Sequence, residues 1–202
     1  MPSHKPGYIT ASTVSPLLTG KGDKLLSGGV THCKKLALER SGIIHPETIL
    51  NADFQGNYAT EWGLEHESDA ITLYEQLNFV DVQSSQVQIE RPNSWLSCTP
   101  DGLVGDNGMV EVKCPHSEYV FLEYLIEPLS LAEQYQDQLQ FQLMLSGRKW
   151  VDIVAYHPHF IDGRNMVTVR VVPDPEWVKK AESRIAQAEE LITEIIKTIK
   201  GE

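Results

Sequence analysis

The chain has 202 residues and a formal net charge of −11, a length that suits one well-buried core and favours a single domain. It contains no apolar run of about 18 residues, and its first residues lack the charged and apolar regions of a signal peptide, so we expect a cytoplasmic protein without a membrane segment. The three cysteines show no CxxC spacing, which argues against a disulfide framework and a zinc knuckle.

Basic residues are concentrated near the N-terminus. Residues 1–40 hold six lysine or arginine side chains and two acidic ones, a balance of +4, which leaves −15 for the remainder. Proteins bind duplex DNA largely through lysine and arginine contacts to the phosphates. Contact with DNA should therefore be concentrated in the N-terminal segment.

Helical signals dominate the first part of the chain. Residues 10–19 predict a short capped helix broken near Pro16, and residues 28–41 predict a second helix. Gly, Pro and Asn in residues 41–57 indicate a loop, after which residues 58–77 predict the strongest helix of this half. Glu67 lies beside an apolar stripe on that helix.

The rest of the chain predicts an α/β fold with one central twisted mixed sheet flanked by helices. The predicted strands cover residues 79–81, 86–91, 95–98, 109–114, 149–156 and 167–172. Helices are predicted over residues 118–125 and 131–145, and apolar residues at helical spacing predict a long amphipathic helix over residues 174–200.

Residues 97–115, SCTPDGLVGDNGMVEVKCP, carry the main functional signal. The Asn-Gly pair at 107–108 is typical of a hairpin, which would bring Asp101 of the Pro-Asp-Gly turn beside Glu111. In a strand, Glu111 and Lys113 project from one face while the apolar residues between and before them pack behind it. The sequence therefore predicts two carboxylates and one ammonium at one place.

This combination suits a metal-dependent hydrolase. Two carboxylates at close range repel each other unless a cation lies between them, and such hard oxygen ligands suit Mg²⁺ or Mn²⁺ better than zinc. The metal polarises a phosphoryl oxygen and lowers the pKa of a bound water, and a nearby lysine helps to orient that water. A Pro-Asp-Gly turn or a Glu-x-Lys ion pair met alone is more often structural, so the prediction of phosphodiester hydrolysis depends on their order around the hairpin.

The order Pro-Asp and then Glu-x-Lys resembles the PD-(D/E)xK nuclease superfamily, and the longer string resembles its phage lambda exonuclease and YqaJ-type viral recombinase family. Three further segments agree in order, at residues 7–12 (GYITAS), 62–67 (WGLEHE) and 135–140 (YQDQLQ). The resemblance covers about residues 5–156. It implies a restriction-endonuclease-like core and a single nuclease domain over residues 1–202.

The resemblance also implies roles for individual residues. Asp101, Glu111 and the backbone carbonyl of Val112 would hold metal, and Glu67 would support a second ion directly or through water. Lys113 would activate the nucleophilic water. Two Mg²⁺ ions, for which Mn²⁺ could substitute, would lie ~4 Å apart.

Further residues belong to this site by resemblance. Gln138 would hold the region of the metal and the scissile phosphate, and Tyr135 can reach the same region from three positions away on one helix. His66 is an alternative that could replace or support Glu67. The pair His157 and His159, with a proline between them at a strand end, is interpreted as part of a surface loop and is left out of the site.

The N-terminal segment would bind the end of the substrate. Ser12 and Lys5 match positions that form a pocket for a terminal 5′-phosphate in the family, and hydroxyl and ammonium donors near a helix start suit such an anion. Lys21 or Lys24 is a weaker match, because the spacing after Ser12 departs from the family pattern.

The implied function is a Mg²⁺-dependent 5′-to-3′ exonuclease on linear double-stranded DNA. It would release 5′-mononucleotides and leave a 3′ single strand for recombination by strand annealing. The expected partners are DNA, a homotrimer ring and a single-strand annealing protein, in the bacterial host cytoplasm if a phage or prophage encodes the chain. Two alternatives stay open: a metal-dependent endonuclease of repair or restriction type, and a DNA-end-binding module that recruits a recombination partner.

Overall fold

The computed structural model describes residues 5–20, 22, 24–45, 58–84 and 87–202, and the chain divides into two compact units. The first unit comprises Met1–Gln55, Ile89–Cys98 and Asp174–Glu202, and the second comprises Gly56–Gln88 and Thr99–Pro173. That residues 1–202 act as a single nuclease domain stays a prediction.

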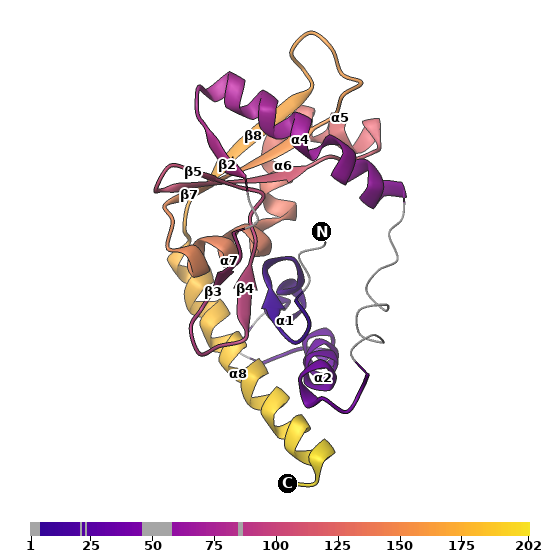
Figure 1. Ribbon diagram of the computed structural model, residues 1–202, viewed down its shortest axis with the longest axis vertical. Coiled ribbons are helices and arrows are strands. Elements are labelled where there is room, and N and C mark those ends of the chain that lie inside the picture. Colours follow the sequence, from indigo (N-terminus) through magenta and orange to yellow (C-terminus); the bar gives the residue numbers. More distant parts are fainter. Residues whose placement is uncertain (1–4, 21, 23, 46–57, 85–86) are drawn as a thin grey trace. The chain divides into compact units, whose positions relative to one another are not determined.

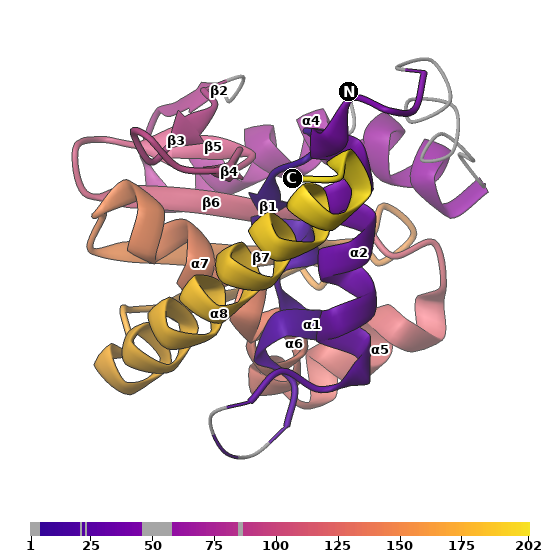
Figure 2. The same cartoon turned by 90° about the horizontal axis from the view of Figure 1, so that it is seen from below.

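The first unit combines a small sheet with helices (Figures 1 and 2). In its three-stranded sheet the central strand β4 pairs parallel with β1 and antiparallel with β3. The strands are β1 (Ile9–Thr10), β3 (Ile89–Glu90) and β4 (Leu96–Cys98). The helical segments are η1 (Ala11–Thr13), α1 (Ser15–Leu18), α2 (Ser27–Ser41) and α8 (Pro175–Lys200).

Helix α8 follows the predicted amphipathic pattern closely. The side chain of Asp174 caps its start by accepting hydrogen bonds from the backbone N–H groups of Glu176 and Trp177. The helix packs against α1 and α2, as Figure 2 shows, and the buried residues of its apolar stripe include Trp177, Ile185 and Ile192. The buried Arg184 interrupts that stripe and donates to the backbone carbonyls of Gly22 and Lys24, so α8 also holds the segment that follows α1.

The second unit is built on a five-stranded sheet of order β2-β5-β6-β7-β8, in which β6 and β7 are parallel and the other neighbours are antiparallel. Its strands are β2 (Val82–Ser84), β5 (Gly102–Val104), β6 (Gly108–Lys113), β7 (Trp150–Tyr156) and β8 (Met166–Val171). Its helices are α4 (Tyr58–Asn78), α5 (Glu118–Ile126), α6 (Pro128–Gln134) and α7 (Gln136–Ser146).

Helices cover both faces of this sheet. Ala70 and Tyr74 of α4 pack against Val110 and Val112 on one face. The helices α5, α6 and α7 supply Phe121, Leu131 and Leu139, among others, to a second core on the opposite face, which includes Met109 of β6. The two layers lie on opposite sides of the strands in Figure 2. The predicted mixed α/β fold is thereby confirmed.

Several local predictions were wrong in detail. The strands near residues 89–91 and 95–98 form a separate sheet rather than extending a single one. The strand expected at 79–81 begins later, because α4 runs to Asn78 and Phe79 then adopts a positive φ. Strand β5 was not predicted, and Pro16 lies in the first turn of α1 instead of breaking the helix, since proline fits that position.

The helix expected over residues 131–145 is interrupted at Tyr135, which ends α6 and precedes α7. Residues 46–57 of the predicted loop lie outside the described residues. Within the described part of the chain, no helix is both long and apolar enough to span a membrane.

Candidate active site

The hairpin of β5 and β6 positions the acidic groups. Strand β5 pairs with β6 through Gly102 opposite Val110, and this pairing leaves Asp101 next to the following residues of β6. There the Oδ2 of Asp101 accepts a 2.7 Å hydrogen bond from the backbone N–H of Val112. The expected approach of Asp101 to the strand that carries Glu111 is confirmed.

Glu111 is the most enclosed acidic side chain of the cluster, with 3% of its surface exposed. Three donors surround its carboxylate. Lys113 Nζ and Gln138 Nε2 reach Oε1 at 2.8 and 2.5 Å, and Gln142 Nε2 reaches Oε2 at 2.7 Å. A buried carboxylate is tolerated only with such partners. The site therefore joins alternate residues of β6 to one face of α7.

Lys113 is held on three sides. Besides its bond to Glu111, its Nζ donates to Oε1 of Gln138 at 3.3 Å and lies 4.6 Å from the ring centroid of Tyr135. Gln138 thus uses both amide atoms, one on Glu111 and one on Lys113. The interruption between α6 and α7 places Tyr135 over the ammonium.

Negative charge exceeds positive charge in this cluster. Burial, reinforced by the charges of Glu111 and Glu67, raises the pKa of Asp101 well above its usual value. Burial and the charge of Glu111 also raise the pKa of Glu67 on α4. Burial alone would lower the pKa of Lys113, but Glu111, Asp101 and Tyr135 together outweigh it and the pKa is raised, so this lysine carries a positive charge at neutral pH.

These residues fit a divalent cation. Three carboxylates interact with one ammonium, and burial together with mutual repulsion raises the pKa of Asp101 and of Glu67, which a bound dication would counteract. The backbone N–H and C=O of one strand residue point to the same side, so the Val112 carbonyl faces Asp101 together with its N–H. Oxygen donors of this kind suit Mg²⁺ and Mn²⁺.

Gln142 was missed by sequence reasoning. It lies four residues after Gln138, one helical turn further on the same face, and it is fully buried. Its Oε1 makes no hydrogen bond to the described residues. The i, i+4 spacing of two glutamines within a buried helix was the available signal.

His66 lies apart from these contacts. Its ring packs against Trp62 with centroids 4.2 Å apart, and its Nδ1 lies 3.8 Å from Oδ2 of Asp69. It also interacts electrostatically with the ring of His157. Through Trp62, His66 is therefore part of a group of rings that includes His157.

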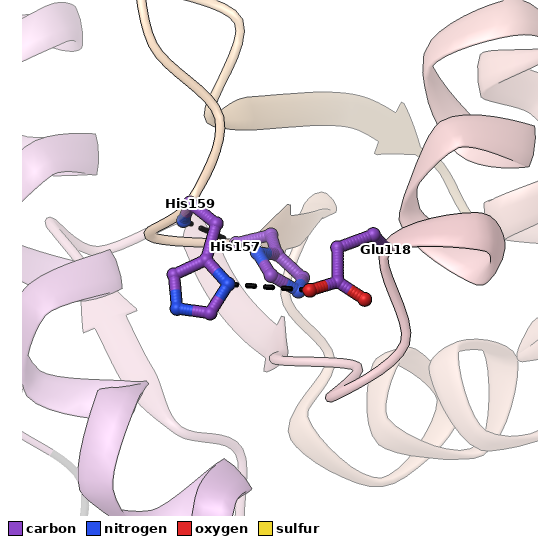
Figure 3. A group of neighbouring side chains, drawn as sticks. All are labelled: Glu118, His157 and His159. Atoms are coloured by element: carbon purple, nitrogen blue, oxygen red, sulfur yellow. Dashed lines mark hydrogen bonds and ion pairs between the residues drawn. The ribbon is translucent and has the colours of Figure 1, made fainter.

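The interpretation of residues 157–159 as a surface loop was wrong for one of the two histidines. His157 is fully buried at the end of β7, while His159 is exposed. Together with the exposed Glu118 they form a group whose side chains point toward one another (Figure 3). Leaving out both histidines overlooked this group, because Glu118 is 39 positions from His157 in the sequence.

The residues expected to bind a 5′-phosphate belong to the first unit. The Nζ of Lys5 forms an ion pair with Glu90 and lies 3.9 Å from the ring centroid of Tyr8. Ser12 is exposed in η1, with its Oγ 3.4 Å from Oγ1 of Thr10. Lys21 lies outside the described residues. The roles of all three stay predictions.

Comparisons with known proteins place the chain in a family. The profile of the YqaJ-like viral recombinase domain matches residues 4–149, and no curated protein matches. An alkaline exonuclease from Laribacter hongkongensis, LHK-Exo, is similar with a TM-score of 0.78 and 25% identity over 96% of this chain and 92% of that one. Its complex with dAMP is similar with a TM-score of 0.79, 25% identity and the same coverage.

A phage related exonuclease from Haemophilus somnus is similar in fold, with a TM-score of 0.79 and 16% identity over 95% of this chain and 96% of that one. The family match covers most of the chain and includes the hairpin that carries Asp101, Glu111 and Lys113. The chain therefore belongs to the YqaJ-like viral recombinase domain family, and it is a nuclease.

Proposed function

We propose that this nuclease is a Mg²⁺-dependent exonuclease that digests the 5′ strand of linear double-stranded DNA. It would release 5′-mononucleotides and leave a 3′ single strand for recombination by strand annealing, in the bacterial host cytoplasm if a phage or prophage encodes it. The convergence of Asp101, Glu111, Lys113 and Gln138 carries this proposal. The alkaline exonuclease from Laribacter and its complex with dAMP, a nucleoside monophosphate, support it.

Asp101, Glu111 and the Val112 carbonyl would hold one ion, and Glu67 would support a second. When bound, such ions polarise a phosphoryl oxygen and lower the pKa of a water. The donor set fits this chemistry because it is made of oxygen atoms and carries excess negative charge.

The chain's own residues supply orientation and charge. The ammonium of Lys113 is held between Glu111 and Gln138, where it can hold the attacking water and offset negative charge on the phosphoryl group. Gln138 and Gln142 fix the Glu111 carboxylate from α7. The oxygen of water forms a bond to phosphorus and loses one proton to the solvent as the bond to the 3′ oxygen breaks, and the leaving oxygen takes up one proton from the solvent.

Digestion of end-labelled duplexes tests the proposal. Linear DNA labelled at either the 5′ or the 3′ end is incubated with Mg²⁺ or with EDTA, beside a covalently closed circle. We expect mononucleotides to appear first from the 5′ ends, only with Mg²⁺, and the circle to survive. Cleavage of the circle would support the endonuclease alternative, and binding of DNA ends without nucleotide release would support the recruitment module.

Substitutions assign the residues. Asp101→Ala, Glu111→Ala and Lys113→Ala should each lower the rate by at least roughly 100-fold, because each removes a ligand or a charge at the reacting phosphate. Asp106→Ala is a matched control, since Asp106 lies exposed in the loop of the same hairpin. Full activity of Lys113→Ala at neutral pH would contradict its role.

The same assay addresses the end of the substrate. If Ser12 and Lys5 bind a terminal phosphate, ends with a 5′-phosphate should be digested faster than ends with a 5′-hydroxyl. Lys5 forms an ion pair with Glu90 in the structure. A terminal phosphate would compete with Glu90 for the same ammonium group. Equal rates on the two kinds of end would remove both residues from the site.

A further inference from the structure

A second group of metal-ligating side chains lies where β7 ends and α5 begins. His157 directly follows β7, His159 stands two positions later, and Glu118 is the first residue of α5. One ligand atom from each, a ring nitrogen or a carboxylate oxygen, lies within 4.8 Å of the other two. Figure 3 shows the carboxylate pointing toward both rings.

The contacts within this group leave one nitrogen unsatisfied. Nδ1 of His159 lies 3.2 Å from Oε1 of Glu118, and the backbone N–H of His159 donates to Nδ1 of His157 at 3.2 Å. The Nε2 of His157 is buried and forms no hydrogen bond of ordinary geometry to a described residue, although the backbone of His116 is placed for a weak hydrogen bond with this ring. A buried polar atom of this kind calls for a ligand or a water.

Aromatic side chains hold the buried ring in place. The centroid of His157 lies 5.6 Å from that of Trp62, 5.7 Å from that of Phe121 and 5.4 Å from that of Phe160. Glu118 and His159 are exposed, and the ring centroid of His159 also lies 5.5 Å from that of Trp62. The group therefore has one fixed member and two members that are free to adjust.

We propose that Glu118, His157 and His159 bind a late transition-metal dication, with Zn²⁺ as the best match, at a site separate from the carboxylate cluster. Two imidazole nitrogens and one carboxylate oxygen are a common zinc ligand set that leaves one position open for water. Mg²⁺ prefers oxygen ligands and selects the carboxylates instead. The ion would tie the start of α5 to the segment after β7.

Binding requires only a small rearrangement. Ligand atoms around a tetrahedral zinc lie about 3.3 Å apart, so the three atoms must approach each other by up to about 1.5 Å. The exposed side chains of Glu118 and His159 can supply this movement. If Nε2 of His157 coordinates the metal, the ring proton moves to Nδ1. Nδ1 then no longer accepts the hydrogen bond from the backbone N–H of His159, and the bond to the metal replaces it.

Cobalt binding tests the proposal, because Co²⁺ takes zinc sites and absorbs visible light when tetrahedral. The full chain carrying Asp101→Asn and Glu111→Gln, which weaken the carboxylate site, is stripped with EDTA and titrated with Co²⁺. We expect one ion per chain, quenching of the fluorescence of Trp62, and displacement by Zn²⁺ but not by Mg²⁺. Trp62→Phe identifies the fluorescence signal.

Variants of the exposed ligands decide the outcome, since a change at the buried His157 could disturb folding. Glu118→Gln and His159→Ala should each weaken Co²⁺ binding by roughly 100-fold or more. Glu123→Gln, on the exposed face of α5, and His45→Ala, an exposed histidine of the first unit, are matched controls that should bind as before. Absence of binding in the background chain, or equal binding after combining Glu118→Gln with His159→Ala, would overturn the site. Introduced into the natural chain, with Asp101 and Glu111 intact, Glu118→Gln and His159→Ala should keep Mg²⁺-dependent digestion.

Discussion

At the scale of single residues, the candidate active site depends on how a buried carboxylate is satisfied. Glu111 has three donors, and the two amides come from positions one helical turn apart on α7. An unpaired carboxylate at this depth would be strongly destabilising or would take up a proton. The glutamines therefore satisfy and orient the Glu111 carboxylate, which a metal ligand requires.

Gln142→Met tests this positioning role. The substitution keeps the side-chain volume but removes the donor to Oε2 of Glu111, so we expect the Mg²⁺-dependent rate to fall about tenfold or more and the Mg²⁺ concentration for half-maximal rate to rise. Gln140→Met is the matched control, because Gln140 is also buried on α7 but donates to the carbonyl of Val172.

Gln142→Met should lose about 2 kcal/mol of stability and Gln140→Met about 1 kcal/mol, because the first removes a hydrogen bond to a carboxylate and the second one to a neutral carbonyl. Thermal unfolding in EDTA measures this loss and separates it from the effect on rate. If both variants retained the same metal dependence, the contact of Gln142 with Glu111 would be structural only.

At the scale of elements, the parallel pair β6 and β7 explains where functional groups gather. Lys113 is the last residue of β6, and it pairs with Ala155 near the end of β7, which His157 follows. The carboxyl ends of parallel strands meet at one edge, and side chains that follow them converge there. Both the carboxylate cluster and the histidine group depend on this edge.

The buried thiol of Cys33 on helix α2 predicts that the stability of the first unit depends on pH. Burial raises the pKa of the Cys33 thiol from 9.0 to about 11. Between these values the unfolded chain loses a proton that the folded chain keeps, so Cys33 contributes stability below pH 9 that is lost as the pH rises toward 11. From pH 8 to pH 10 this loss should be about 1.4 kcal/mol.

Cys33→Ala isolates that contribution. The variant should be less stable than the natural chain at pH 8, by about 1–2 kcal/mol for the cavity it leaves, and this difference should shrink by about 1.4 kcal/mol at pH 10. Urea unfolding at the two pH values measures it. A difference that is the same at pH 8 and pH 10 would show that the thiol does not titrate in this window.

At the scale of the whole molecule, the charge of −11 raises the question of how the protein stays on DNA. Residues 1–40 carry a positive balance of +4 against −15 for the remainder, so a single copy offers few phosphate contacts and should leave duplex DNA quickly at physiological salt. Cyclic symmetry would bring several N-terminal segments toward one channel. This supports the expected ring of three chains, with an annealing protein as a further partner.

Light scattering at micromolar concentration tests the ring. We expect a mass of three chains, unchanged on dilution to the lower micromolar range. Digestion under a trap of competitor DNA should continue along the duplex first bound, because a closed ring dissociates slowly. A mass of one or two chains together with distributive digestion would exclude the ring.

The sequence by itself determined the features that depend on neighbouring residues. The Asn-Gly turn and the alternation along residues 109–113 predicted that Glu111 and Lys113 share one face and that Asp101 lies beside them, because turn geometry and strand periodicity act over a few positions. The long helices were predictable for the same reason.

Only the tertiary structure decided the contacts between distant segments. Gln142 donates to Glu111, which is 31 positions away in the sequence, and His159 contacts Glu118, which is 41 positions away. The division of the strands between two sheets likewise depends on which strand edges pair. Local periodicity shows which face of a helix or strand is polar, but it does not determine which other element packs against that face. That choice is made by the packing of α7 and α5 on the sheet, which buries the apolar residues around these polar groups and so requires them to be satisfied.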